Sequence, residues 1–119
     1  MRLMQQDERF HRPVVTLIET PAPYLGKDAE DTGVAAAIAG WLRASATLAT
    51  PMIAVITGEA GSGGALALAC CDEGWMTSES MYAILSPGGF AAILFKDVTG
   101  AIEAAALIKL TPAIGNAKV

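Results

Sequence analysis

A glycine-rich segment in the middle of the chain is the feature best suited to chemistry. Its sequence is Gly58-Glu59-Ala60-Gly61-Ser62-Gly63-Gly64; the apolar run Met52 to Thr57 precedes it and the helix-forming run Ala65 to Ala69 follows it. The first turn of a helix leaves backbone N–H groups without intrahelical partners, and glycine lets another molecule approach the backbone closely. Such a turn is suited to bind a negatively charged oxygen, either of a phosphate or of an oxyanion formed during a reaction.

Two nucleotide-binding patterns do not fit this segment. A P-loop requires G-x-x-x-x-G-K-[ST]; Gly58 and Gly63 have the spacing, but Gly64 and Ala65 stand where lysine and Ser or Thr belong. The dinucleotide pattern requires a third glycine at the position that Leu66 occupies. The segment is therefore expected to bind something other than a pyrophosphate.

Ser62 offers an alternative as the nucleophile of a degenerate G-x-S-x-G elbow. The base would then have to be His11, the only histidine in the sequence. His11 precedes Ser62, which is the reverse of the order in α/β hydrolases, and serine at a helix start often serves only as a cap. We prefer an oxyanion hole, because it requires N–H groups and no catalytic side chain in the loop.

Composition limits the possible classes of protein. At 119 residues the chain is expected to form a single domain, and with 53% hydrophobic and 17% charged residues some of its apolar surface is expected to contact a partner. The net charge of −4 and the scattered basic residues argue against nucleic acid. The adjacent Cys70 and Cys71 lack metal-ligand spacing, so no metal site is expected. No membrane span or secretory signal is recognised, which favours the cytoplasm.

Apolar runs and chain-breaking residues predict alternating strands and helices. Strands are expected at Val14–Ile18, Met52–Thr57, Gly74–Met76 and Met81–Leu85, and helices at Leu3–Phe10, Val34–Ala49, Ala65–Ala69, Phe90–Phe95 and Ile102–Leu110. Pro21 to Gly33 is expected to be an exposed loop, and Ser86 to Gly89 a second glycine turn before a buried helix. The alternation predicts an α/β layer architecture.

Four motifs, in this order, resemble the carboxyltransferase alpha subunits of bacterial acetyl-coenzyme A carboxylase. They are Pro13 to Pro21, the loop around Tyr24 with Ala29 and Glu30, Gly58 to Ala67, and Tyr82 to Leu94. The resemblance extends from about Leu3 to Leu110 and covers only the middle of a longer subunit. It implies a partial crotonase-like (ClpP/crotonase) fold, a superhelix of ββα units, in a single domain fragment over residues 1–119.

The resemblance also implies an activity. Such a transferase moves a carboxyl group from carboxybiotin on a carrier protein to acetyl-coenzyme A, which gives malonyl-coenzyme A for fatty acid biosynthesis. The implied partners in a hetero-oligomer are a carboxyltransferase beta subunit, biotin carboxyl carrier protein and biotin carboxylase. The N–H groups of Gly61, Gly63 and Gly64 would stabilise charge on the ureido oxygen of biotin.

Further residues are expected near the cofactor. They are Tyr24, Glu59, Ser62, Ala65, Gly88 and Gly89. Structural roles are also open to two of them, because Glu59 beside a helix start could act on the helix dipole alone and Tyr24 could be a packing residue.

Three loops depart from the family pattern. The family's P-G-A-Y-P-G, E-E-R-G-Q and S-P-E-G are replaced by Pro21 to Gly26, Glu30 to Val34 and Ser86 to Gly89, which removes a flexible glycine, an arginine and a glutamate. Two alternatives therefore stay open: an inactive truncated remnant, and another coenzyme A enzyme of this fold, such as a malonate decarboxylase subunit or an enoyl-coenzyme A hydratase. A hydratase needs acid and base carboxylates, and only Glu19, Glu59 and Glu79 are near the predicted turns.

Overall fold

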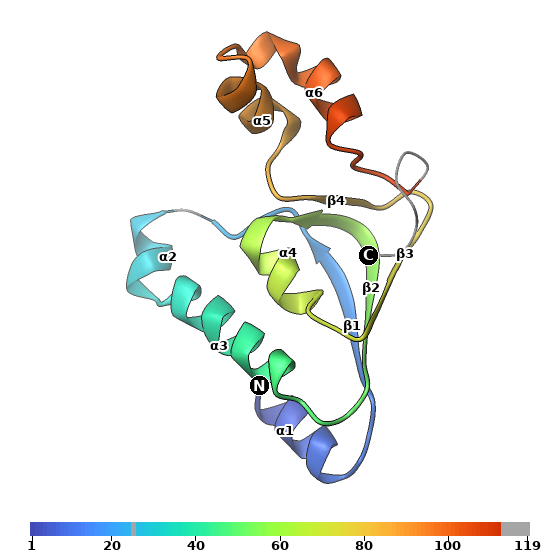
Figure 1. The fold of residues 1–119 in the computed structure, drawn as a ribbon. Coiled ribbons are helices and arrows are strands. Elements are labelled where there is room, and N and C mark those ends of the chain that lie inside the picture. The colour runs from blue at the N-terminus through green and yellow to red at the C-terminus, as the bar shows by residue number, and fades with distance from the viewer. Residues whose placement is uncertain (25, 113–119) are drawn as a thin grey trace.

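The computed structural model describes residues 1–24 and 26–112 and shows a parallel β-sheet with helices packed along one side of it (Figure 1). The strands are β1 (Val14–Thr20), β2 (Met52–Gly61), β3 (Glu73–Met76) and β4 (Met81–Ala83). The helices are α1 (Arg2–Arg9), α2 (Lys27–Asp31), α3 (Val34–Ala46), α4 (Ser62–Leu68), α5 (Pro87–Leu94) and α6 (Ala101–Leu107), with a 3₁₀ turn η1 (Val98–Gly100).

Strand β2 is the centre of the sheet. It pairs in parallel with β1 along one edge, and with β3 and then β4 along the other. β3 pairs with its first half, from Ile53 to Ile56, and β4 pairs with its end, from Glu59 to Gly61. The carboxyl end of β2 therefore lies between the end of β1 and strand β4, and it delivers the glycine-rich segment to that position.

Small residues allow α4 to lie close against the sheet. Ala54, Ala60 and Ala65 are buried together with Ile18 and Ile56 in one cluster. The hydroxyl of Thr16 donates a 2.9 Å hydrogen bond to the carbonyl of Leu68 at the end of α4, which ties that helix to β1. A second cluster, Met4, Val14 and Met52, lies under α1 and α3 and includes Trp41 at its margin. The first cluster therefore holds the junction of β2 and α4 in place, and the second packs the opposite end of the sheet against α1 and α3.

The predicted strands and helices are confirmed, with corrections at four places. The segment Pro21 to Gly33 is not all loop, since α2 forms within it. Strand β2 was expected to end at Thr57 but continues to Gly61, because β4 pairs with its last residues. The second glycine turn is the first turn of α5, where the Ser86 hydroxyl accepts a hydrogen bond from the amide of Gly89.

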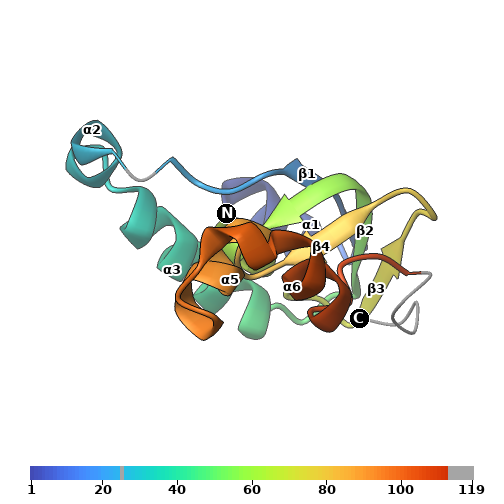
Figure 2. The ribbon, with the colours of Figure 1, turned by 90° about the horizontal axis from the view of Figure 1, so that it is seen from above.

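The prediction that Phe90 to Phe95 is a buried helix is wrong for this chain. Helices α5 and α6 form a hairpin that packs mainly on itself and projects beyond the sheet (Figures 1 and 2). The interior of the hairpin is small. Among its described residues, the two that are fully buried are the alanines Ala91 and Ala104. Large apolar side chains on its outside remain exposed, with Ile102 88% accessible. The apolar sequence therefore marks a surface, not an internal core.

Two partly buried groups, the Cys71 thiol and the Tyr82 hydroxyl, make the stability of the fold fall at alkaline pH. Burial raises the pKa of the Cys71 thiol, which packs between the two clusters, and burial also raises the pKa of the Tyr82 hydroxyl. The folded protein therefore keeps these protons at pH values where the unfolded chain has lost them, so the stabilisation is complete below the unfolded pKa values and is lost as pH rises through the folded ones.

We expect the free energy of unfolding to fall between about pH 9 and pH 11, where thiols and phenols ordinarily titrate. Urea unfolding at constant ionic strength across this range measures the slope. The double variant Cys71→Ala, Tyr82→Phe should show a flatter dependence on pH. An unchanged slope in that variant would contradict the assignment.

Candidate active site

The junction of β2 and α4 turns the chain sharply from strand to helix. Gly61 ends the strand with extended backbone angles and is the N-cap of α4, and Ser62 follows in the left-handed region with φ of 59°. No side chain caps this helix, so the amides of its first turn, including those of Gly63 and Gly64, are not taken up by a capping side chain. The junction thus presents backbone N–H groups at the carboxyl edge of the sheet.

The three glycines of the turn have different surroundings. A Cβ on Gly61 would overlap the carbonyl oxygen of Pro21, and a Cβ on Gly64 would lie 3.3 Å from Cδ of Pro23. A Cβ on Gly63 would meet nothing within 4 Å. Gly61 is therefore required by the protein's own backbone, whereas the space beside Gly63 is open to a ligand.

A cleft of about 240 Å³ lies beside this junction. Glu59, Gly61 and Ser62 line it together with the connection from β4 to α5, from Ile84 to Pro87. Pro21 and Ala22, just after β1, close another side. The cleft is therefore built where the carboxyl ends of neighbouring parallel strands meet, which is the usual place for ligands in open α/β sheets.

The expected site residues are only partly gathered around this cleft. Glu59, Gly61 and Ser62 line it, and Gly63 and Gly64 follow in the first turn of α4. Gly88 and Gly89 lie in the first turn of α5, next to the lining residues Ser86 and Pro87, but the amide of Gly89 already donates to the Ser86 hydroxyl at 3.2 Å. The side chain of Ala65 is fully buried in the sheet core and does not reach the cleft.

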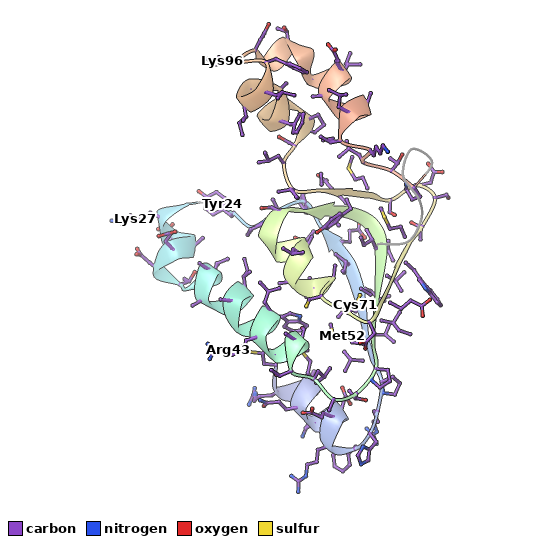
Figure 3. All side chains as sticks on the ribbon, in the orientation of Figure 1. Tyr24, Lys27, Arg43, Met52, Cys71 and Lys96 are labelled. Atoms are coloured by element: carbon purple, nitrogen blue, oxygen red, sulfur yellow. The ribbon has the colours of Figure 1, made fainter. Side chains whose placement is uncertain are left out.

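Tyr24 lies apart from the cleft. Its side chain is 78% accessible and lines a separate hollow of about 130 Å³ with residues of α2 and α3. Figure 3 shows it beside Lys27, far from Lys96 on the α5–α6 hairpin. Tyr24 is therefore not among the residues that line the cleft, although its neighbour Pro23 lies against Gly64 of the glycine turn.

The segment from Pro21 to Pro23 was not expected from the sequence to touch the glycine turn. It crosses over Gly61 and Gly64 because β1 and β2 are parallel neighbours, so the chain leaving β1 runs beside the chain leaving β2. Pro23, one of the departures from the family pattern, makes the contact with Gly64. A prediction that β1 and β2 are neighbouring parallel strands would have indicated this contact.

The alternative with Ser62 as nucleophile and His11 as base is excluded by geometry. His11 precedes the start of β1, where Val14 pairs with Met52, and Ser62 follows the opposite end of the ten-residue β2. A strand rises about 3.3 Å per residue, so the two side chains are roughly 30 Å apart. A nucleophile and its base must be within hydrogen-bond reach.

A hydratase-type pair of carboxylates is not assembled either. Among the described residues lining the cleft, Glu59 is the one carboxylate. The Glu19 side chain lies over Gly58, and Glu79 is exposed in the turn between β3 and β4. Within residues 1–24 and 26–112, no three His, Cys, Asp or Glu side chains gather to hold a metal ion. What the site offers is a set of backbone N–H groups beside a mainly apolar cleft.

Solved structures with this fold define the class. Transcarboxylase 12S, crystallised with methylmalonyl-coenzyme A and methylmalonic acid, matches with a TM-score of 0.82 and 22% identity over 93% of this chain and 24% of that chain. The beta subunit of Pseudomonas aeruginosa geranyl-CoA carboxylase matches with a TM-score of 0.76 and 16% identity over 98% of this chain and 26% of that chain. The fold is thus the crotonase-like fold of carboxyltransferases, as the sequence predicted.

The sequence then identifies the family within that class. Residues 1–117 match the family model described as acetyl co-enzyme A carboxylase carboxyltransferase-like, and the chain belongs to this family. The acetyl-coenzyme A carboxylase carboxyl transferase subunit alpha of Streptococcus sanguinis (strain SK36) is 56% identical over 111 residues, which are 93% of this chain and 43% of that protein.

The same subunit of Streptococcus pneumoniae (strain Hungary19A-6) is 57% identical over 111 residues, 93% of this chain and 44% of that protein. The chain therefore spans less than half the length of these relatives. Within the described residues, no helix has the length and apolar character needed to cross a membrane.

Proposed function

We propose that the chain is a carboxyltransferase element of acetyl-coenzyme A carboxylase, which acts in the transfer of a carboxyl group from biotin to acetyl-coenzyme A. The observation that carries this proposal is the uncapped first turn of α4 beside the cleft, in a chain that belongs to the carboxyltransferase-like family. Carboxyl transfer from biotin develops negative charge on the ureido oxygen, and backbone amides fixed in place stabilise such charge without reorganising.

The residues present fit a biotin ring at this position. The ureido group of biotin is a neutral hydrogen-bond acceptor, and the first turn of α4 offers N–H donors with open space beside Gly63. Carboxybiotin, when bound, supplies the carboxyl group that is transferred.

In this proposal the chain's own contribution is electrostatic and positional. The amides of Gly63 and Gly64 hold an oxygen that gains negative charge, and each such donor is worth about 3 to 4 kcal/mol of transition-state stabilisation. The contact of Pro23 with Gly64 and the fit of Gly61 against the Pro21 carbonyl fix the direction in which these amides point. The cleft would hold the ligand in a fixed position, because the ends of β2 and β4 and the residues just after β1 line it.

A carboxyltransferase beta subunit is the proposed partner next to the cleft. The lining residues Ile84 and Leu85 lead directly into the α5–α6 hairpin, so a protein bound to the hairpin would lie beside the cleft. The exposed Ile93 and Ile102 supply apolar contact area for it. Biotin carboxyl carrier protein, and biotin carboxylase, which recharges it, complete the proposed hetero-oligomer.

An exchange assay tests the proposed function. The chain is mixed with the beta subunit of the S. sanguinis enzyme, and transfer of the carboxyl group from malonyl-coenzyme A to biocytin is followed. We expect exchange above that of either protein alone, with the full S. sanguinis alpha subunit as the positive control. The absence of exchange at every protein concentration, while that control is active, would identify the chain as an inactive remnant.

A further inference from the structure

One face of the sheet carries an apolar surface with no described helix on it. Alternate residues of β1, Val14, Thr16 and Ile18, point toward α4 and the core, so the intervening residues point to the other side. That other face, called here the open face, consists of Val15, Leu17, Ile53, Val55 and Trp75, which are cross-strand neighbours in the register of β1, β2 and β3. Figures 1 and 2 show α3 and α4 on the opposite side.

The side chains of the open face are apolar, yet several of them are largely exposed to solvent. Leu17 is 71% accessible, Val15 is 56% accessible and Trp75 is 52% accessible. The indole N–H of Trp75 donates to the carboxylate of Glu73 at 2.8 Å, so the ring has a fixed partner at the margin of the face. Parallel sheets occur almost only with both faces covered, and their strands are apolar on both sides for that reason.

The edge of the sheet beside this face is also unfinished. β1 pairs with β2 along one side, and no described strand pairs with its other side. β1 is seven residues long, and it contains neither proline nor lysine, the residues that commonly protect an edge from further pairing. The open face and the free edge therefore meet at β1.

We infer that the open face is covered by alpha-subunit polypeptide from outside the 111 residues that match, and not by the beta subunit or by a second copy. The S. sanguinis subunit is 56% identical over the segment that contains this sheet, yet the segment is only 43% of its length. The relative thus has more than half of its polypeptide available to cover the same face. This inference rests on family membership and not on the proposed catalytic step.

Cysteine labelling tests this inference. Leu17→Cys is made in a chain that also carries Cys70→Ser and Cys71→Ser, and its rate of reaction with maleimide is measured by mass spectrometry. The measurement is repeated in a chimera in which this chain replaces the 111 matched residues of the S. sanguinis alpha subunit. We expect labelling at position 17 to be at least about tenfold slower in the chimera, because a packed residue reacts only on local opening.

Lys27→Cys, at an exposed polar position on α2, is the matched control and should label at similar rates in both proteins. Equal rates at position 17 in the two proteins would overturn the inference. Protection of position 17 in the isolated chain that increases with its concentration would also overturn it, because a second copy would then cover the face. Since a chimera can misfold, the residue aligned with Leu17 is also changed to cysteine in the intact S. sanguinis subunit, where fast labelling would give the same negative answer.

Discussion

Gly61→Ala is expected to cost about 3 kcal/mol or more of the free energy of unfolding, because overpacking that forces a backbone to move is among the costly single changes. The added methyl carbon would overlap the carbonyl oxygen of Pro21, and neither partner can move away easily. Gly61 is in the ladder with Ala83 of β4, and Pro21 follows directly after β1. The cost is purely steric, since the backbone angles of Gly61, φ −127° and ψ 138°, are allowed for alanine.

Urea unfolding of the variant and the parent measures this cost. Gly40→Ala is the matched control, because its added methyl would meet only the flexible end of the Met1 side chain at 3.2 Å, and alanine is favoured over glycine inside a helix. We expect the control to be at least as stable as the parent. A Gly61→Ala variant that unfolds at the same urea concentration as the parent would show that the Pro21 segment can leave the glycine turn.

The strand and helix order follows from local signals in the sequence. Runs such as Val14 to Ile18 and Met52 to Thr57 are rich in β-branched residues and each directly follows a proline. Ala65 to Ala69 has high helix propensity directly after glycines. The carboxyl edge of β2 could be predicted as a ligand site for the same reason: a strand, glycines and a helix start stand in immediate succession.

The parts that the sequence did not predict depend on contacts between distant segments. Strand β2 extends to Gly61 because Met81 to Ala83 pairs with its end, and no local pattern in Gly58 to Gly61 predicts a strand. Tyr24 lines a hollow with α2 and α3 and not the cleft, because the loop around Tyr24 leads into α2. The exposure of the α5–α6 hairpin could not be predicted from the sequence, because an exposed apolar helix and a buried one have the same composition.

The same contacts explain why the family glycines cannot be treated as equivalent. Three glycines at one turn predict three amide donors, but Gly61 is needed by the Pro21 carbonyl and Gly64 touches Pro23. Only at Gly63 is the absence of a side chain unexplained by the described part of the protein. A glycine with open space beside it has no structural reason to be glycine, which makes it the position where a ligand explains the residue type.

Gly63→Ala is therefore expected to leave the fold intact and to lower carboxyl exchange about tenfold to a hundredfold. Its φ is not in the left-handed region and its Cβ would meet nothing within 4 Å, so stability should be unchanged or higher by up to about 1 kcal/mol. The methyl group would occupy the space through which a charged oxygen approaches the amide, and a displacement of about 1 Å at a reacting centre can cost a hundredfold in rate.

The exchange reaction with the S. sanguinis beta subunit gives kcat/KM for the variant and the parent, and urea unfolding gives their stabilities. The comparison with Gly61→Ala is decisive, because the same chemical change is made two residues apart. At position 61 the loss of activity should follow the loss of fold, whereas at position 63 activity should fall while the fold is retained. Full activity of a folded Gly63→Ala variant would mean that no ligand approaches this amide, and the oxyanion role of the α4 turn would then have to be abandoned.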